Sequence, residues 1–368
     1  QLFVVSRMNG ANSLRDIQAH YCRATGQIVP MEQFDRLVSQ LNDLHYLDGE
    51  GFRAYLAGLE ETFRSLAVRP SRHAGSAYEA EADRLRRQIA DFFTHPEGPG
   101  TPAGPGSAPV LRGLVAPHID FHRGGITYAH AYKTLAEQSE ADTFIIFGTC
   151  HGPMPGRFAL TEKGFDTALG VVPADREFVQ CLTSRLGRDT FLGEFAHRGE
   201  HSIELQTVFL AYLLGGCRDF RIVPILVGSF QDICAQGSSP ACNPEVAEMV
   251  RAVRETMAEI PRSYCLLAAA DLAHVGRRFG DASGPTEATM REVERRDRGF
   301  LTLVEAGDAE GVFRSIAEDG DRRRVCGYPS IYMTLSCLER PVGRLLQYRQ
   351  WADFPAGAAV TFAGVAIY

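Results

Sequence analysis

The chain has 368 residues, 45% of them hydrophobic, and a formal net charge of −7, which together fit one large globular domain plus a small one. No apolar run approaches the ~20 residues that a transmembrane helix needs, we expect no signal peptide, and the negative charge argues against general nucleic-acid binding. The nine cysteines are scattered and form no C-x-x-C pair. Reduced thiols in a cytoplasmic protein are therefore expected.

Residues 1–66 are predicted to form a separate module. Ser13 is a favourable N-cap for a first helix that Gly26 would end, and Pro30 begins a second helix. A small hairpin is expected over residues 44–52, which would make the module winged-helix-like. Because basic residues do not outnumber acidic ones here, docking of a peptide or protein is favoured over DNA binding.

The rest of the chain, residues 70–368, is predicted to be an α/β domain. A helix is expected over residues 79–93, followed by a mobile Pro/Gly loop over residues 96–109. From residue 110 onward, candidate strands alternate with helices, which predicts a mixed, largely parallel sheet flanked by helices. The candidate strands are 111–116, 143–148, 220–227, 264–270, 342–348 and 359–367.

Three of these apolar runs lead directly into a histidine. His118, His151 and His274 each follow a predicted strand, and His201 stands at the start of a helix with its body at 205–214. Ligands of open α/β sheets bind outside the carboxyl ends of the strands, so we expect these four imidazoles to face one cleft. A single histidine is more often a surface or hydrogen-bonding residue, and this is how we interpret the following: His20, His45, His95 and His197.

The cleft histidines suggest a metal site. Neutral imidazole is the commonest protein metal ligand, and two or three histidines with one carboxylate suit Fe, Zn, Mn or Cu. Asp271 and His274 are three residues apart, so a short helical turn would place both on one side. An open coordination position would then bind substrate or dioxygen.

Two further segments are candidates for substrate binding. Asp120 and Arg123 belong to a polar, glycine-rich loop that could bind an anionic group or simply turn into a helix over residues 126–135. Cys326 precedes another helix and could place a thiol at the rim of the cleft. Structural packing is the alternative role for this thiol.

Several motifs, in this order, resemble the Memo family, specifically its AmmeMemoRadiSam system protein B branch. The resemblance covers roughly residues 70–368, and the added first module is similar to small winged-helix peptide-binding domains. The family's fold is similar to that of class III, non-haem-iron extradiol dioxygenases. The motifs are Arg72-His-Ala-Gly-Ser-Ala-Tyr, Ala116-Pro-His, Gly148-Thr-Cys-His, Glu200-His-Ser-Ile-Glu, Val223-Pro-Ile-Leu-Val-Gly, Asp271-Leu-Ala-His and Val325-Cys-Gly.

The resemblance implies roles for individual residues. His118 and His151 match the family's two metal-binding histidines, and His201 matches its cleft histidine, which in the dioxygenase relatives would serve as acid or base. The family's metal cysteine corresponds here to Ala273, which cannot coordinate a metal. His201, Asp271 and His274 are the alternatives for a third ligand, and His201 and His274 are the candidate catalytic residues.

The first functional hypothesis is a metal-dependent, dioxygenase-like oxidoreductase. Fe(II) is the expected metal, with Zn, Mn and Cu as alternatives. The second hypothesis is a non-catalytic, metal-carrying or partner-binding component of a system with a radical-SAM protein and an AMMECR-type protein. Hydrolysis at a metal-bound hydroxide would use the same residues and is not separated from oxidation by the sequence.

Overall fold

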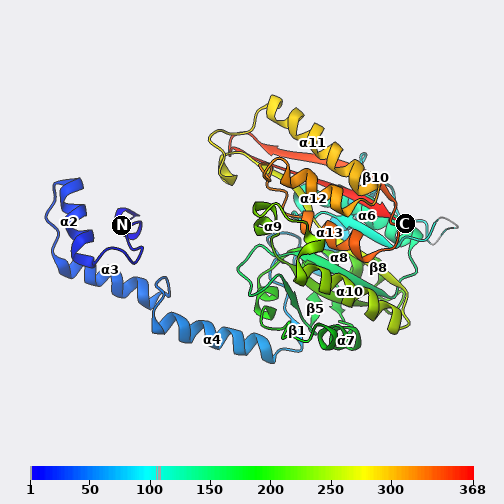
Figure 1. The fold of residues 1–368 in the computed structure, drawn as a ribbon, viewed down its shortest axis with the longest axis horizontal. Coiled ribbons are helices and arrows are strands. Elements are labelled where there is room, and N and C mark those ends of the chain that lie inside the picture. The colour runs from blue at the N-terminus through cyan, green and yellow to red at the C-terminus, as the bar shows by residue number, and fades with distance from the viewer. Residues whose placement is uncertain (1, 105, 107–108) are drawn as a thin grey trace. The chain divides into compact units, whose positions relative to one another are not determined.

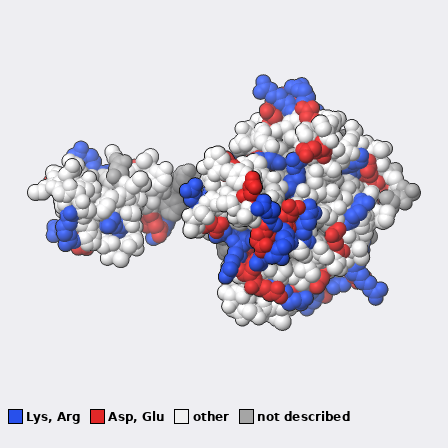
Figure 2. Space-filling model, turned by 90° about the horizontal axis from the view of Figure 1, so that it is seen from above, with Lys and Arg blue, Asp and Glu red and all other residues white. Residues whose placement is uncertain are grey.

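The structure is a computed structural model that describes residues 2–104, 106 and 109–368 (Figure 1). The chain divides into two compact units, Gln1–Ser65 and Leu66–Tyr368. No helix of the described ranges is long and apolar enough to cross a membrane. All nine cysteines are free thiols. On the face drawn in Figure 2, acidic and basic side chains are interspersed rather than sorted into broad areas of one sign.

The first unit is helical, and both helices predicted around Ser13 and Pro30 are confirmed. The side chain of Ser13 caps α2 and Gly26 ends it in the left-handed conformation at φ 69°. Buried Val4, Ile17 and Phe34 form a small core. The helices are α1 (Leu2–Val5), α2 (Leu14–Thr25), α3 (Met31–Asp43) and α4 (Glu50–Ser65).

The hairpin expected over residues 44–52 is not formed. Residues 44–49 lie in turns and bends, and Glu50 already begins α4. The reason is the apolar pattern that follows, because Phe52, Leu56, Leu59 and Phe63 recur at helical spacing. In the described part of this unit there is therefore no strand pair that would serve as a wing.

The second unit is built on an eight-stranded mixed sheet, which confirms the predicted α/β class. The central strands β2, β8, β3 and β7 run parallel to one another, and antiparallel strands flank them. All six predicted strands are present. The order is β10 (Gly343–Asp353), β11 (Ala358–Ile367), β2 (Gly113–Ala116), β8 (Tyr264–Ala269), β3 (Thr143–Thr149), β7 (Arg221–Val227) and β4 (Phe158–Leu160), with β9 (Asp271–Val275) paired to β11.

Helices cover both faces of this sheet (Figure 1). Successive residues of β3 show the division, because Phe144 and Ile146 pack into one apolar cluster and Ile145 and Phe147 into the other. The helices are α5 (Ala82–Thr94), α6 (Phe121–Gln138), α7 (Arg176–Leu186), α8 (Ser202–Leu214), α9 (Gln231–Ala235), α10 (Pro244–Glu259), α11 (Glu287–Glu305), α12 (Ala309–Ala317) and α13 (Tyr328–Cys337). A small second sheet joins β1 (Val68–Arg69), β5 (Gly164–Thr167) and β6 (Gly170–Val172), and the short 3₁₀ helices are η1 (Glu194–Arg198), η2 (Pro240–Cys242) and η3 (Arg277–Phe279).

The Pro/Gly loop predicted over residues 96–109 falls partly on residues 105, 107 and 108, which lie outside the described residues. Its described part is bonded to α6. The Lys133 ammonium donates to the carbonyl of Pro99 at 2.7 Å, and the backbone N–H of Ala103 donates to Glu137 at 2.9 Å.

The glycine-rich segment after Asp120 is helical, so its assignment to a loop is wrong. Asp120 is the N-cap of α6 and accepts the backbone N–H of Arg123 at 3.1 Å. Glycine is needed inside this helix for close packing. A Cβ at Gly124 would lie 2.5 Å from Ile119, and one at Gly125 would lie 2.4 Å from Phe92.

The helical turn expected for Asp271 to His274 is also wrong, because these residues form the strand β9. Asp271 pairs with Phe362 and His274 pairs with Val360, so two residues of β9 stand opposite the single residue Thr361. This β-bulge breaks the strict alternation of the strand. As a result, Asp271 and His274 face the same side although they are three residues apart.

Candidate metal centre

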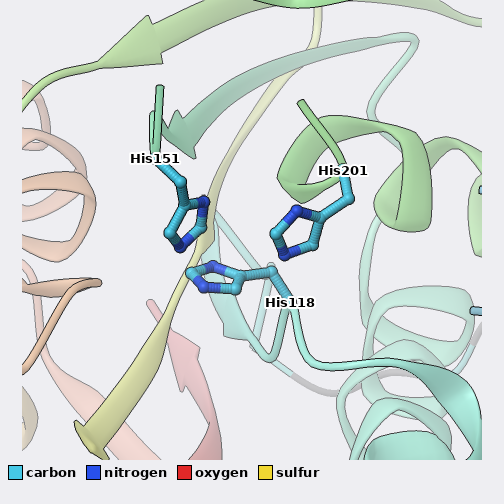
Figure 3. A group of neighbouring side chains, drawn as sticks. All are labelled: His118, His151 and His201. Atoms are coloured by element: carbon cyan, nitrogen blue, oxygen red, sulfur yellow. The ribbon is translucent and has the colours of Figure 1, made fainter. Parts of the chain in front are cut away.

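Three histidines from separate parts of the chain converge at the carboxyl edge of the sheet (Figure 3). His118 follows β2, His151 follows β3, and His201 is the N-cap residue of α8. One ligand nitrogen from each lies within 4.8 Å of the other two. His118 is buried, whereas His151 and His201 are open to the cavity that the group lines. The predicted convergence of these three imidazoles is present.

Close packing of α8 against β3 brings His201 beside His151. A Cβ at Gly148 would lie 2.4 Å from the side chain of Ile203, so only glycine allows this approach. The Ser202 hydroxyl donates to the carbonyl of Thr149 at 2.8 Å and ties the start of α8 to the end of β3. The ring centroids of His151 and His201 are 4.8 Å apart as a result.

The Nδ1 atom of each histidine is already engaged by an oxygen atom. His118 Nδ1 lies 2.9 Å from the carbonyl oxygen of Ala269. His151 Nδ1 and His201 Nδ1 each lie 3.1 Å from the carboxylate of Glu200. Such a partner on one ring nitrogen fixes the tautomer and orientation of a metal-binding histidine. The three Nε2 atoms are therefore the donors left for a metal.

Glu200 organises two of the three histidines. Its buried carboxylate also accepts the backbone N–H groups of His151 at 2.8 Å, His201 at 2.8 Å and Ser202 at 3.0 Å. Burial raises the pKa of Glu200, but its bonds to the two imidazoles outweigh this and hold the pKa well below its usual value. For His151, burial acts to lower the pKa, but the hydrogen bond to Glu200 and the charge of that carboxylate outweigh this effect. The pKa of His151 is therefore raised above its usual value.

His118 is held in the neutral form that a metal requires. Burial lowers its pKa to about 4. Beside it, Asp271 accepts the backbone N–H groups of His118 at 2.9 Å and Ile119 at 3.2 Å through Oδ1. Its other oxygen, Oδ2, lies 3.8 Å from His118 Nε2. A donor set of three imidazoles with a carboxylate at hand fits a transition metal ion.

The histidines open into a cavity of about 340 Å³, a size typical of small-molecule sites. His274 lines it and is held through Nδ1, which lies 3.1 Å and 3.2 Å from the carbonyl oxygens of Leu272 and Arg324. Burial lowers the pKa of His274, so its imidazole is neutral and Nε2 faces no hydrogen-bond partner among the described residues. The lining residues also include His73, Asp120, Arg123, Arg278, Phe279 and Trp351.

Asp120 and Arg123, both predicted to bind substrate, line the cavity and are paired with each other. The guanidinium Nε of Arg123 donates to Asp120 Oδ2 at 2.7 Å. The same guanidinium lies over the ring of Trp351, 4.6 Å from the ring centroid. This pair therefore supports an aromatic wall of the cavity.

Cys326 does not line this cavity but lies beside the Nε2 atom of His118. Its Sγ is 3.4 Å from His118 Nε2, and it lines a neighbouring cavity of about 200 Å³ together with Cys150 and His151. Burial raises the pKa of the Cys326 thiol. Ala273 points elsewhere, because it packs in a buried apolar cluster with Val275, Met290, Val293 and Ala359.

Sequence reasoning missed the residues that support the site. The sequence places Glu200 next to His201 and so shows that it lies near this histidine. Its bond to His151 could not be foreseen, because it depends on the packing of α8 against β3. His73 belongs to a motif noted in the sequence, and its ring lies 5.5 Å from that of His201. Trp351 and Phe279 carried no signal, because nothing in the sequence links their segments to the strand ends.

The segment that carries His73 is held over the cavity by one buried carboxylate. Glu204, one turn after His201 on α8, accepts the backbone N–H of His73 at 2.9 Å and the hydroxyl of Tyr78 at 2.7 Å. It also forms a fully buried ion pair with Arg69 at 2.6 Å. The charge of Arg69 and these hydrogen bonds outweigh the effect of burial and lower the pKa of Glu204.

Comparison with known proteins shows which family this chain is similar to. Residues 69–366 match the family described as Memo-like protein. A MEMO1 family protein of Aquifex aeolicus is 26% identical over 370 residues, covering 100% of this chain and 91% of that protein. One from Thermus thermophilus is 27% identical, covering 95% of this chain and 97% of that protein. One from Methanopyrus kandleri is 35% identical, covering 76% of this chain and 91% of that protein.

Proposed function

This chain belongs to the Memo-like protein family, and from that premise we propose that it is a non-haem metal protein with dioxygenase-like oxidoreductase activity. We place it in the cytoplasm as a component of an AmmeMemoRadiSam system. The observation that carries the proposal is the convergence of three imidazoles whose Nδ1 atoms are all bonded to oxygen. A site of this kind is arranged to present three Nε2 atoms to one ion.

In this proposal His118, His151 and His201 hold the metal, with Asp271 as the nearest carboxylate. Fe(II) is the metal we propose, with Zn, Mn or Cu as alternatives that the same donors accept. When bound, such an ion supplies open positions for a substrate oxygen and for dioxygen. The cavity beside the histidines is where the substrate would lie.

His274 is the residue that we assign to proton transfer. Both nitrogens of His201 are engaged in this proposal, one by Glu200 and one by the metal, so His201 has none left for a proton. His274 is neutral, and with Nδ1 held by two carbonyl oxygens it keeps the lone pair of Nε2 for a substrate hydroxyl. Asp120 and Arg123 shape the substrate side of the cavity by supporting Trp351. The Cys326 thiol borders the centre beside the Nε2 atom of His118.

Elemental analysis after anaerobic purification without added metal tests the proposal. We expect near-stoichiometric iron in the wild-type protein and none in the His118→Ala, His151→Ala double variant. Oxygen consumption with catechol-type substrates should follow the iron content of the samples. Absence of metal from the wild-type protein even after reconstitution would contradict the proposal.

The second candidate is a metal-carrying or partner-binding component without catalysis. The observation that favours it is a cavity of about 300 Å³ within the first unit, between α2 and α3, lined by Tyr21, Val29, Phe34 and Leu37 among others. We propose that this unit docks a radical-SAM protein, an AMMECR-type protein or a peptide. Tight binding of such a partner by metal-loaded protein that consumes no oxygen would favour this candidate over the first.

A further inference from the structure

One wall of the cavity is apolar and partly aromatic. Ile119, Val360 and Phe362 form a buried cluster, and Phe279 and Trp351 pack against it. All of these except Phe362 line the cavity. A flat, apolar body would therefore be accommodated beside the metal centre.

The cavity also carries a positive charge that no neighbour neutralises. Of its two arginines, Arg123 is paired with Asp120. The Arg278 guanidinium has no ion pair or hydrogen bond with any residue in the described ranges, and its side chain is exposed. Asp271, the other lining carboxylate, is 2% exposed and is occupied by backbone N–H groups. The exposed charge of the lining without a partner in the described ranges is therefore the guanidinium of Arg278.

The backbone that carries Arg278 is firmly placed. Gly276 at φ 110° and Gly280 at φ 95° bound the short helix η3, and a Cβ at Gly276 would collide with the Gly357 carbonyl at 2.3 Å. The Gly276 N–H donates to Asp281 at 2.6 Å. On the same helix, the ring of Phe279 meets that of His274 edge-on, with centroids 5.0 Å apart. Arg278 therefore stands on a fixed backbone and lines the cavity with a side chain that has no hydrogen bond or ion pair within the described ranges.

We infer that the cavity takes an aromatic carboxylic acid and that Arg278 determines this specificity. The ring lies against the wall formed by Trp351 and Phe279, and the carboxylate pairs with the Arg278 guanidinium, whose planar fork matches a carboxylate. The inference rests on the proposed function, because the opposite, hydroxylated end of the ligand faces the metal histidines.

The single tryptophan of the chain makes binding directly measurable. Because Trp351 is the sole tryptophan and lines the cavity, its fluorescence reports on a ring that lies against it. The probes are 3,4-dihydroxybenzoate and its neutral counterpart 3,4-dihydroxybenzyl alcohol. Each is titrated against iron-loaded and metal-free protein by fluorescence and by calorimetry. We expect the acid to bind about tenfold more tightly than the alcohol, as for one hydrogen-bonded charge pair.

Variants at two adjacent arginines separate recognition from general charge. Arg278→Gln should remove the roughly tenfold preference for the acid and leave the alcohol unaffected, and Arg278→Lys should keep part of it. The matched control is Arg277→Gln, since Arg277 lies beside Gly284 and Gly357 and does not line the cavity. This control should bind both probes as the wild-type protein does.

The inference is overturned by equal affinity for acid and alcohol, by binding of neither probe, or by an equal loss of affinity in Arg277→Gln. Iron content measured on the same samples tests the proposed function separately. Iron bound without a preference for the acid defeats only this inference. An Arg278-dependent preference in a protein that takes up no iron defeats only the proposed function.

Discussion

Glu200 and His151 are joined twice, because Oε2 of the carboxylate accepts the backbone N–H of His151 at 2.8 Å and lies 3.1 Å from Nδ1 of its ring. The backbone bond fixes where the residue is, and the ring bond fixes which way the imidazole faces. Since the same carboxylate also engages His201, one side chain orients two corners of the candidate metal centre.

Glu200→Gln should weaken metal binding while the protein stays folded. The amide keeps the size of the side chain but loses the charge that holds both Nδ1–H groups, and loss of such a supporting carboxylate costs about 10–100-fold in metal affinity. Competition with a coloured chelator measures the change. Glu204→Gln is the matched control, because Glu204 is a buried carboxylate on the same helix that contacts none of the three histidines. This control should lower the thermal stability far more than the metal affinity.

His201→Ala should lose bound metal, as His118→Ala and His151→Ala should. The resemblance to the family left the third ligand open, but the ligand nitrogens of all three residues are mutually within 4.8 Å. Metal content is compared with circular dichroism spectra so that unfolding is detected. Full retention of metal in His201→Ala would return the third position to Asp271 or His274.

His274→Gln should keep its metal and lose most turnover. The amide fits the place of the ring but cannot accept and release a proton, a function that contributes about 10²–10⁴-fold in general acid–base catalysis. Single-turnover rates at equal iron content are the measurement. Unchanged rates would exclude His274 as the proton acceptor.

Ala273→Cys should not create a sulfur ligand, even though the resemblance to the Memo family implies a metal-binding cysteine at this position. The Ala273 methyl packs against Met290 and Val293 in a closed apolar cluster, so a thiol there is directed into the core. Added volume in such a cluster costs about 1–3 kcal/mol of stability. The absorption of the cobalt-substituted protein is the test, because a new sulfur-to-cobalt band would contradict this placement.

The stability of the larger unit should fall on mild acidification through His197. Burial lowers the pKa of His197 to about 3, whereas the unfolded chain has the ordinary value near 6.5. Between these values the unfolded state binds more protons, so the stabilisation present above pH 6.5 decreases as the pH falls toward 3. The free energy of unfolding should drop by about 2 kcal/mol from pH 6.5 to 4.5 through this group alone.

Denaturant unfolding of His197→Gln at both pH values isolates this effect. The variant loses the titrating ring but keeps a donor for the carbonyl of Ala159, which His197 Nε2 now contacts at 3.0 Å. Between pH 6.5 and 4.5, the free energy of unfolding of the variant should therefore fall by about 2 kcal/mol less than that of the wild-type protein. An identical pH dependence in both proteins would show that His197 does not contribute.

Much of the fold was predictable because the parallel strands are buried on both faces. The runs that became β3 and β7 are almost wholly apolar, and the histidines that follow such strands must emerge at one edge of the sheet. His118 and His151 were found in this way, and His201 from its place at the start of a helix. The cavity wall was not predictable, because Trp351 and Phe279 reach it only through the pairing of β11 with β10 and β9.

Local rules failed where tertiary packing decided the outcome. Gly124 and Gly125 are typical of a loop, but their missing Cβ atoms allow α6 to pack tightly. The spacing of Asp271 and His274 suits a helical turn, but pairing with β11 keeps the segment extended. In both cases a neighbouring element supplies the contacts that override the local preference.

The bulge opposite Thr361 lets β9 hold one more residue than the two-residue spacing at which a regular strand places side chains on one face. Deleting either Leu272 or Ala273 would remove the bulge and restore strict alternation, and the histidine, then two residues after Asp271, would still face the cavity. A single lost codon at this place would thus leave both side chains on the cavity side of the strand. The same deletion outside the bulge would instead turn one of the two side chains to the opposite face.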